Sequence, residues 1–215
     1  MSKTTVSNYD RVVIPQWAFD FQGHRCICMP LGFRAGMHAM HLLGVTREKD
    51  YGTFVFSELS DDDSSGCFDD GVQIATGATY GKGLYKRLAY GKLAVTLYRP
   101  EIGAVRVHVR NDFLESLTGG VGAPFLALRS QGVNPSAMPD DVIGPILDFI
   151  TSERAGDMFE HELKSDFAFR PRVKAMTRRK CAQCGEYTFE AEGVAIGERF
   201  SCKACYLGIG APERP

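Results

Sequence analysis

The sequence has no apolar run long enough to span a membrane, almost no net charge and no internal repeat. A transmembrane helix needs about 18 or more predominantly apolar residues, so no membrane partner is expected. A net charge of -1 over 215 residues gives no field that would by itself recruit nucleic acid. The first residues, MSKTTVSNYDRVV, lack the basic start and apolar stretch of a signal peptide. We therefore expect a cytoplasmic protein.

The cysteine count is odd, at seven, and this matters because the expected compartment is reducing. Thiols in such a compartment bind metals or carry out chemistry more often than they form structural disulfides. The length suits one full domain with a small appendage.

Helical and strand patterns are mixed along the first 165 residues without a regular strand–helix repeat. This mixture predicts an α+β fold, with a mixed or antiparallel sheet and packed helices, rather than a doubly wound sheet. Val105, Val107 and Val109 alternate with polar residues, as in a half-buried strand. Predicted strands cover residues 51–59, 92–100 and 103–110. Predicted helices cover residues 29–45 (entered near Pro30, with a glycine stop at Gly44), 67–77 (ending at Gly77), 111–117 (capped by Asn111 or Asp112) and 138–163 (one or two helices, interrupted at Gly144-Pro145).

The composition becomes basic after Leu163, which predicts a boundary. We expect a core domain over residues 1–168, a basic linker over 169–180 and a zinc-finger domain over 181–215. The basic residues of the linker are Arg170, Arg172, Lys174, Arg178, Arg179 and Lys180.

The C-terminal cysteines form two CxxC pairs with seventeen residues between them, Cys181 with Cys184 and Cys202 with Cys205. This spacing is typical of a structural four-thiolate Zn²⁺ site in a zinc ribbon or treble clef. So short a segment cannot bury an adequate core, and the metal would supply much of its folding free energy. A site saturated by four thiolates has no open position and says little about activity.

The glycine-rich stretch from Thr76 to Gly83, TGATYGKG, does not fit a phosphate-binding P-loop. Thr76 stands where that motif needs its first glycine, and Gly83 stands where it needs a serine or threonine hydroxyl. The stretch is either a flexible loop that carries Lys82 to an anionic group or a turn between two elements. The acidic run at residues 61–63 has the ligand type of a hard-cation site, but we favour its interpretation as a solvated turn.

The stretch GHRCIC, residues 23–28, places one imidazole and two thiols close together before a helix. Cysteines often pack as small apolar residues, but a helix N-terminus favours a thiolate. From the residues alone, Cys26 and Cys28 are either small packed side chains of the core or members of a functional site.

The motifs GHRCICMPLGFRAG, GCFDDGVQIATGATYGKG and YGKLAVTLY resemble successive motifs of the FmdE family, whose name comes from a component of formylmethanofuran dehydrogenase. The resemblance covers about residues 15–110, and some members also carry a C-terminal treble-clef finger. This sequence departs from the family pattern where Ile27-Cys28 replaces Pro-Gly and Ala78 replaces a cysteine. The matching residues are Gly23, His24, Cys26, Gly32, Arg34, Cys67, Asp70, Gln73, Thr76, Gly77, Thr79, Gly81, Lys82, Gly83, Gly91 and Lys92.

The resemblance implies a homodimer in which His24, Cys26 and Cys67 converge on one cleft and hold a second metal ion of soft character, such as zinc, iron, copper(I) or nickel. It also implies that Asp70, Gln73 and Lys82 line the cleft. The residues expected to bind a cofactor there are Cys28, Asp70, Gln73 and Thr79.

Three functions follow. The first is a metal-binding accessory protein of a molybdenum, tungsten or other anaerobic redox enzyme. The second is an enzyme in its own right, with Cys26 or Cys67 as nucleophile or metal ligand, His24 as acid/base and Lys82 binding an anionic substrate or cofactor. The third, which we favour least, is a regulator that binds nucleic acid through the basic linker and finger.

Overall fold

The computed structural model of the chain describes residues 12–61, 64–171 and 176–208. The basic residues Arg172 and Lys174 and the last two residues of the acidic run lie outside these ranges. The chain divides into two compact units, residues 1–168 and 169–215, and each is described by itself. Among the described residues, no helix is long and apolar enough to cross a membrane.

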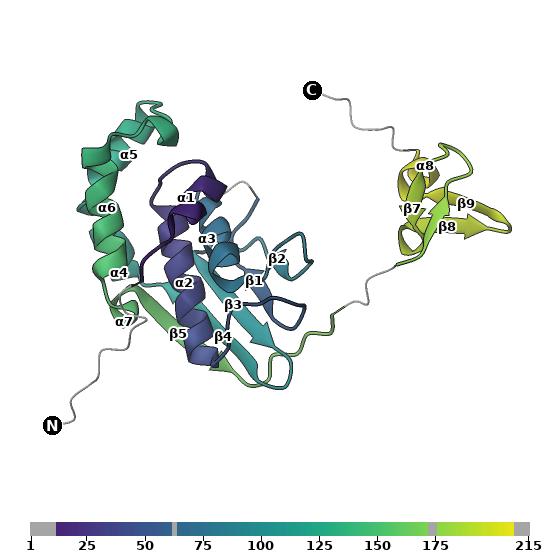
Figure 1. Cartoon of the computed structure of the whole chain (residues 1–215), viewed down its shortest axis with the longest axis horizontal. Coiled ribbons are helices and arrows are strands. Elements are labelled where there is room, and N and C mark those ends of the chain that lie inside the picture. The colour runs from purple at the N-terminus through teal and green to yellow at the C-terminus, as the bar shows by residue number, and fades with distance from the viewer. Residues whose placement is uncertain (1–11, 62–63, 172–175, 209–215) are drawn as a thin grey trace. The chain divides into compact units, whose positions relative to one another are not determined.

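The first unit is built on a five-stranded sheet, and the predicted α+β class with a mixed sheet is confirmed (Figure 1). The strand order is β2-β1-β3-β4-β5; β1 pairs with β2 in parallel, and the other neighbours are antiparallel. The strands are β1 (Phe54–Ser57), β2 (Tyr85–Arg87), β3 (Ala94–Arg99), β4 (Gly103–Val109) and β5 (Phe159–Lys164).

The valine alternation in β4 places Val105, Val107 and Val109 in the core, as predicted. Helices α2 (Cys28–Leu43) and α3 (Cys67–Thr76) pack together against the sheet, and each ends at a glycine in the left-handed conformation, Gly44 and Gly77. Glycine adopts this conformation without the steric penalty of a Cβ atom. The predicted ends of both helices are therefore confirmed.

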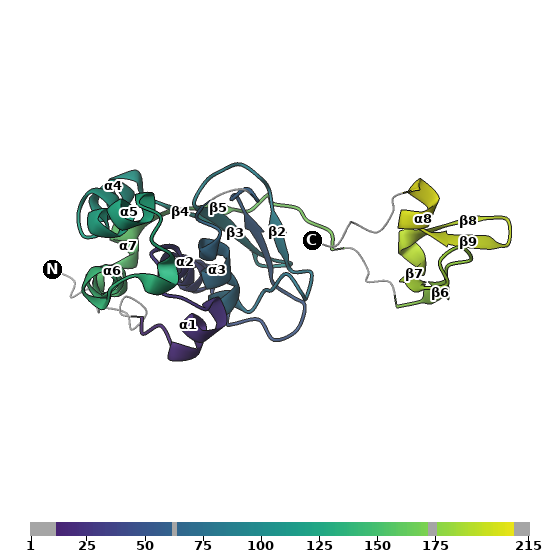
Figure 2. The same cartoon turned by 90° about the horizontal axis from the view of Figure 1, so that it is seen from above.

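The remaining helices of the unit are α1 (Gln16–Gln22), α4 (Asn111–Gly119), α5 (Ala123–Ser130), the 3₁₀ turn η1 (Pro135–Ala137), α6 (Asp140–Ser152) and α7 (Ala155–Met158). Among them, α6 and α7 pack against α2, α4 and α5 contact these two helices, and α1 contacts α3 (Figure 2).

Arg34, one of the residues shared with the family motif, joins α2 to the end of α6. Its side chain is buried, and its guanidinium donates to the backbone oxygens of Ile150, Thr151 and Glu153 at 2.8, 2.9 and 2.6 Å. The last carbonyls of a helix have no partner within the helix. Arg34 satisfies them, so its role is to hold the helical layer together.

Three predictions for residues 111–163 need correction. The N-cap of α4 is Arg110, not Asn111 or Asp112, although the Asp112 carboxylate does accept from the next backbone N–H. Helix α6 continues through Pro145 without interruption, because its buried face packs in the core and offsets one lost hydrogen bond.

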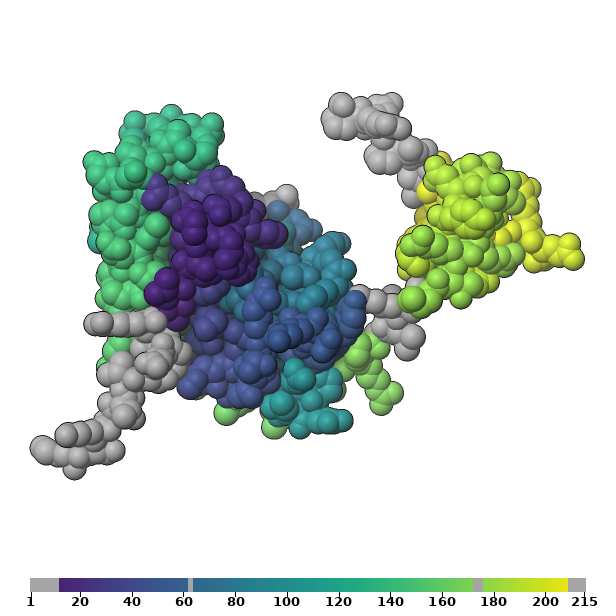
Figure 3. Space-filling view, in the orientation of Figure 1, coloured from purple at the N-terminus to yellow at the C-terminus, as the bar shows by residue number. Residues whose placement is uncertain are grey.

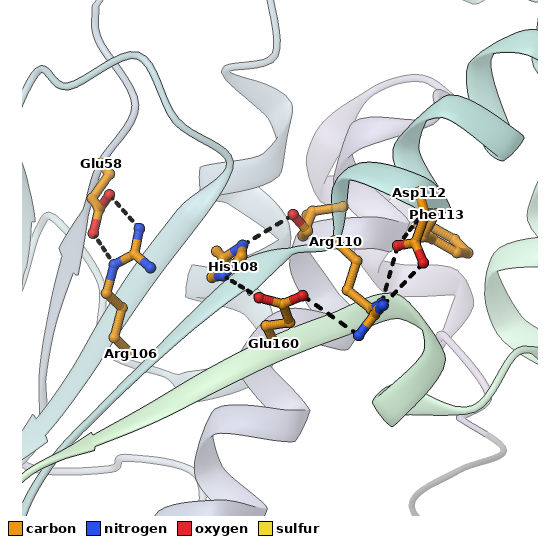
Figure 4. Close-up of polar contacts among 8 residues, drawn as sticks. Glu58, Arg106, His108, Arg110, Asp112, Phe113 and Glu160 are labelled. Carbon is orange, nitrogen blue, oxygen red and sulfur yellow. Dashed lines mark hydrogen bonds and ion pairs between the residues drawn. The ribbon is translucent and has the colours of Figure 1, made fainter.

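Residues 159–164 form strand β5 rather than helix. The strand lies at the sheet edge, where Glu160 is 3.2 Å from His108 and 3.5 Å from Arg110 of the β4 side (Figure 4). Its residues Glu160 to Leu163 are exposed, so no alternation of apolar side chains marks it in the sequence.

The second unit is a small finger made of two hairpins and a helix. Its elements are β6 (Arg178–Lys180), β7 (Tyr187–Phe189), the 3₁₀ turn η2 (Glu190–Glu192), β8 (Gly193–Ile196), β9 (Arg199–Cys202) and α8 (Lys203–Leu207).

Candidate metal centre

The crossing of α2 and α3 brings together residues far apart in the sequence. A Cβ atom on Gly32 would lie 1.9 Å from the backbone oxygen of Phe68, and one on Gly71 would lie 2.0 Å from that of Met29. Both distances are impossible for a real side chain, so glycine at these two positions permits the helices to touch. The first turns of the two helices are thereby held side by side.

His24, Cys26 and Cys67 meet beside this crossing and form what we call the front triad. Their candidate ligand atoms all lie within 4.8 Å of one another, and His24 Nε2 is 3.7 Å from Cys67 Sγ. Gln22 Nε2 also donates to Cys67 Sγ at 3.0 Å. Cys28, the first residue of α2, lies outside the group.

The two thiols of the triad are not equivalent. The hydrogen bond from Cys26, together with the neighbouring His24, lowers the pKa of Cys67 to about 6. The same hydrogen bond and burial raise the pKa of Cys26 far above its ordinary value. Cys67 is therefore the thiolate at neutral pH and Cys26 keeps its proton. Burial raises the pKa of Cys28 to about 11, which keeps it a thiol.

The other predicted site residues lie on α3 and on the loop that follows. Asp70 is half-buried; burial and Asp69 raise the pKa of its carboxyl, while the positive charge of Arg87 and the proximity of His24 lower it. Gln73 Oε1 accepts from the backbone N–H of the following loop at residue 80, at 2.8 Å.

Lys82 and Thr79 hold this loop in place. Lys82 Nζ donates to the backbone oxygens of Glu48, Lys49 and Gly77 at 3.2, 3.3 and 3.1 Å. Thr79 Oγ1 accepts from the backbone N–H of Lys82 at 3.3 Å. The stretch from Thr76 to Gly83 thus forms a turn that is held by hydrogen bonds to residues 48–49.

A cavity of about 470 Å³ opens beside the front triad, with His24 in its wall. It lies between α1 and the η1–α6 segment, whose surfaces adjoin in Figure 3. The other lining residues are Gln16, Phe19, Asp20, Gly23, Arg25, Pro135, Ser136, Met138 and Ile143. No sequence signal marks the α6 side of this cavity, because that helix is distant along the chain.

Gln22 contacts the front triad although it was not among the predicted site residues. Its Oε1 is buried and has no hydrogen-bond partner within the described structure. A buried amide oxygen without a partner marks a place where a donor or an ion would be stabilised.

The four C-terminal cysteines form a second group. Their sulfur atoms also lie within 4.8 Å of one another. Backbone N–H groups of Gln183 and Cys202 point at Cys181 Sγ from 3.4 and 3.3 Å. Backbone hydrogen bonds lower the pKa of Cys181 to about 6, which favours the thiolate form that binds metals. The predicted four-cysteine cluster is confirmed.

Two arginines of the finger cover aromatic rings of the same unit. The guanidinium carbons of Arg178 and Arg179 lie 4.6 Å from the ring centroids of Phe189 and Phe200. Part of the basic charge that suggested a nucleic-acid surface is therefore engaged within the finger.

Residues 21–124, which contain the whole front triad, match the FmdE family, described as "FmdE, Molybdenum formylmethanofuran dehydrogenase operon". The core is FmdE-like. The expected resemblance is thus confirmed for this part of the chain, and Asp70, Gln73, Thr79 and Lys82 fall within the matching range.

Two further proteins are similar to this chain. A "Probable S-adenosyl-L-methionine-binding protein" of Archaeoglobus fulgidus is 29% identical over 199 residues, which cover 89% of this chain and 53% of that protein. The chain therefore spans about half the length of this curated relative. The solved structure of a "tungsten formylmethanofuran dehydrogenase subunit e (fmde)-like protein" from Syntrophus aciditrophicus has 21% sequence identity and a TM-score of 0.49, over 85% of this chain and 86% of the other.

Proposed function

We propose that this protein is a metal-binding, FmdE-like accessory protein whose front triad holds a metal ion separate from the one in the finger. The observation that supports this most directly is the convergence of His24, Cys26 and Cys67 within 4.8 Å. The triad residues are half-buried or buried, so a bound ion would be shielded from bulk water on one side.

The donor set fits a soft or borderline transition metal. One imidazole and two thiols suit zinc, iron, copper(I) or nickel rather than calcium or magnesium. Three protein ligands leave one coordination position open, in contrast to the four-thiolate group. An ion there would supply Lewis-acid or redox chemistry at that position. Cys67 is already a thiolate, and binding would release the proton of Cys26.

The finger metal is proposed to be a structural Zn²⁺ held by Cys181, Cys184, Cys202 and Cys205. The description of the family supports a partner in a molybdenum or tungsten formylmethanofuran dehydrogenase system or another anaerobic redox enzyme. A homodimer remains our proposal for the oligomeric state. Light scattering on the purified protein tests the dimer, and crosslinking to a purified formylmethanofuran dehydrogenase tests the partner.

The metal proposal is tested by mass spectrometry of metal content in protein purified without oxygen. We expect about two metal ions per chain, one for each group. Cys26→Ser and Cys67→Ser should each lose one ion, and Cys184→Ser should lose the other. Cys28→Ser is the matched control, since it removes a neighbouring thiol outside the triad, and should keep both. Equal metal content in the wild type and Cys67→Ser would refute the metal centre.

A second candidate is an enzyme that binds a small molecule in the cavity beside His24. The cavity volume is about 470 Å³, within the range of ligand sites, and the Archaeoglobus relative is named as probably binding S-adenosyl-L-methionine. Equilibrium dialysis with S-adenosyl-L-methionine tests this. Binding that is lost in His24→Ala and kept in Cys184→Ser would support the enzyme; no binding to the metal-loaded protein would refute this ligand.

A further inference from the structure

A second cavity, also of about 470 Å³, lies at the β2 side of α3 and involves none of the residues assigned to the metal. We call it the Arg87 pocket. Its lining residues are Asp61, Asp69, Gln73, Tyr80, Tyr85 and Arg87.

Asp69 fixes the floor of the Arg87 pocket. The carboxylate is buried and accepts hydrogen bonds from Ser57 Oγ at 2.6 Å, Tyr85 Oη at 2.8 Å and Arg87 Nε at 2.6 Å. A buried carboxylate with this many donors is fully satisfied. It therefore does not serve as a ligand itself; its effect is to balance the charge of Arg87 and hold the guanidinium in one orientation.

Asp61 binds the same guanidinium at its Nη1 atom. Its Oδ1 accepts from Arg87 Nη1 at 3.0 Å, yet the Asp61 side chain is 88% exposed. An ion pair with one solvated partner adds little stability and exchanges readily with water. The Asp61 carboxylate thus stands where a carboxylate from outside could bind Arg87, whose planar fork matches that group.

An aromatic surface lies beside this charge. Tyr80 is 78% exposed, and its backbone N–H is held by Gln73 Oε1 at 2.8 Å, which fixes the start of its loop on α3. A large ring kept in solvent next to an arginine offers a face for another flat group. Gln73 itself also lines the pocket.

We propose that the Arg87 pocket binds a small aromatic carboxylate, with its carboxylate on Arg87 in place of that of Asp61 and its ring against Tyr80. A monoanion fits better than phosphate. The second negative charge of phosphate would face the carboxylates of Asp61 and Asp69, which line the pocket with one arginine to balance them. This site does not depend on a metal in the front triad, so it goes beyond the function proposed above.

The test is a titration of the full-length protein with benzoate, monitored by calorimetry or by amide chemical shifts. Benzamide and inorganic phosphate are titrated in the same way as comparison ligands. We expect weak benzoate binding, with a Kd of roughly millimolar given the small ligand, and weaker binding of the two comparators. Benzamide or phosphate binding as tightly as benzoate would overturn the proposal.

The deciding variant is Asp61→Asn. We expect it to tighten benzoate binding, whereas a substitution that disturbed the fold would weaken it. Removal of the internal competitor should tighten benzoate binding about three-fold or more. Tyr80→Ala should weaken benzoate about five-fold and leave acetate unchanged. Arg87→Gln should weaken both by about ten-fold or more, while the exposed neighbour Lys86→Gln, which removes the same charge, should change neither.

Asp61 and Tyr80 are both exposed, so their variants are expected to fold even if Arg87→Gln leaves Asp69 without its ion partner and destabilises the protein. A benzoate affinity that is unchanged or weakened in Asp61→Asn overturns the proposal.

Discussion

The backbone oxygen of Phe68 occupies the space that any side chain on Gly32 would need, 1.9 Å from the position of its Cβ atom. This contact fixes the spacing of α2 and α3, and through it the meeting of Cys26 with Cys67. The front triad is thus a product of helix packing.

Gly32→Ala and Gly71→Ala should each force α2 and α3 apart. Overpacking of this kind costs about 1–3 kcal/mol, and the separation should also reduce metal retention by the core. Thermal unfolding and metal content measure the two effects. Gly144→Ala in α6 is the control, because its Cβ meets nothing within 4 Å; it should be neutral or stabilising by about 0.5–1 kcal/mol. A Gly32→Ala protein with unchanged midpoint and metal content would contradict this account.

In the metal-free protein, Cys67 should react with iodoacetamide already at pH 7. Its pKa of about 6 lies below that of an ordinary thiol, so the thiolate dominates above pH 6 and reactivity falls on acidification through this value. Cys28, with a pKa of about 11, should remain unmodified under the same conditions. Peptide mapping by mass spectrometry gives the ratio of Cys67 to Cys28 modification. Cys26→Ala should shift the reactivity profile of Cys67 to higher pH, because it removes the principal hydrogen bond; an unshifted profile would show that this bond is unimportant.

The ion pair between Glu58 and Arg106 should make the core sensitive to acid. Glu58 accepts two hydrogen bonds from Arg106, at 2.6 and 2.8 Å, which lower its pKa (Figure 4). A carboxyl with a lowered folded-state pKa stabilises the protein above its unfolded pKa, near 4.5, and this contribution is lost as the pH falls through the folded value.

Glu58→Gln should therefore cost about 1–3 kcal/mol at pH 7, and its difference from the wild type should shrink below about pH 4. Denaturant unfolding at several pH values measures this. Glu162→Gln removes a carboxylate that is 63% exposed and should change stability by less than about 0.5 kcal/mol. A Glu58→Gln penalty that is constant from pH 7 to pH 3 would contradict the linkage.

Chelation should unfold the finger and leave the core intact. Among the described residues of the finger, only Cys181 and Phe200 are buried, so little apolar surface holds this unit without its metal. After treatment with a strong chelator, or in Cys184→Ser, proteolysis should cut within residues 176–208 while the core fragment persists. A finger that resists protease without metal would show that packing alone folds it.

The sequence by itself determined the features that depend on local spacing. The two CxxC pairs specified the finger group, Gly44 and Gly77 specified where α2 and α3 end, and the valine alternation specified β4. Each of these follows from the geometry of one turn, one helix end or one strand. The motif resemblance also identified the three residues of the front triad.

Only the tertiary structure decided how these three residues come together. His24 and Cys67 are 43 residues apart, and their contact depends on two glycines that allow a close helix crossing. Cys28, two residues from Cys26, lies outside the group, which no local spacing foretold. Strand β5 was missed for a related reason: its exposed side chains carry no apolar period, and pairing with β4 at the sheet edge, a long-range interaction, made it a strand.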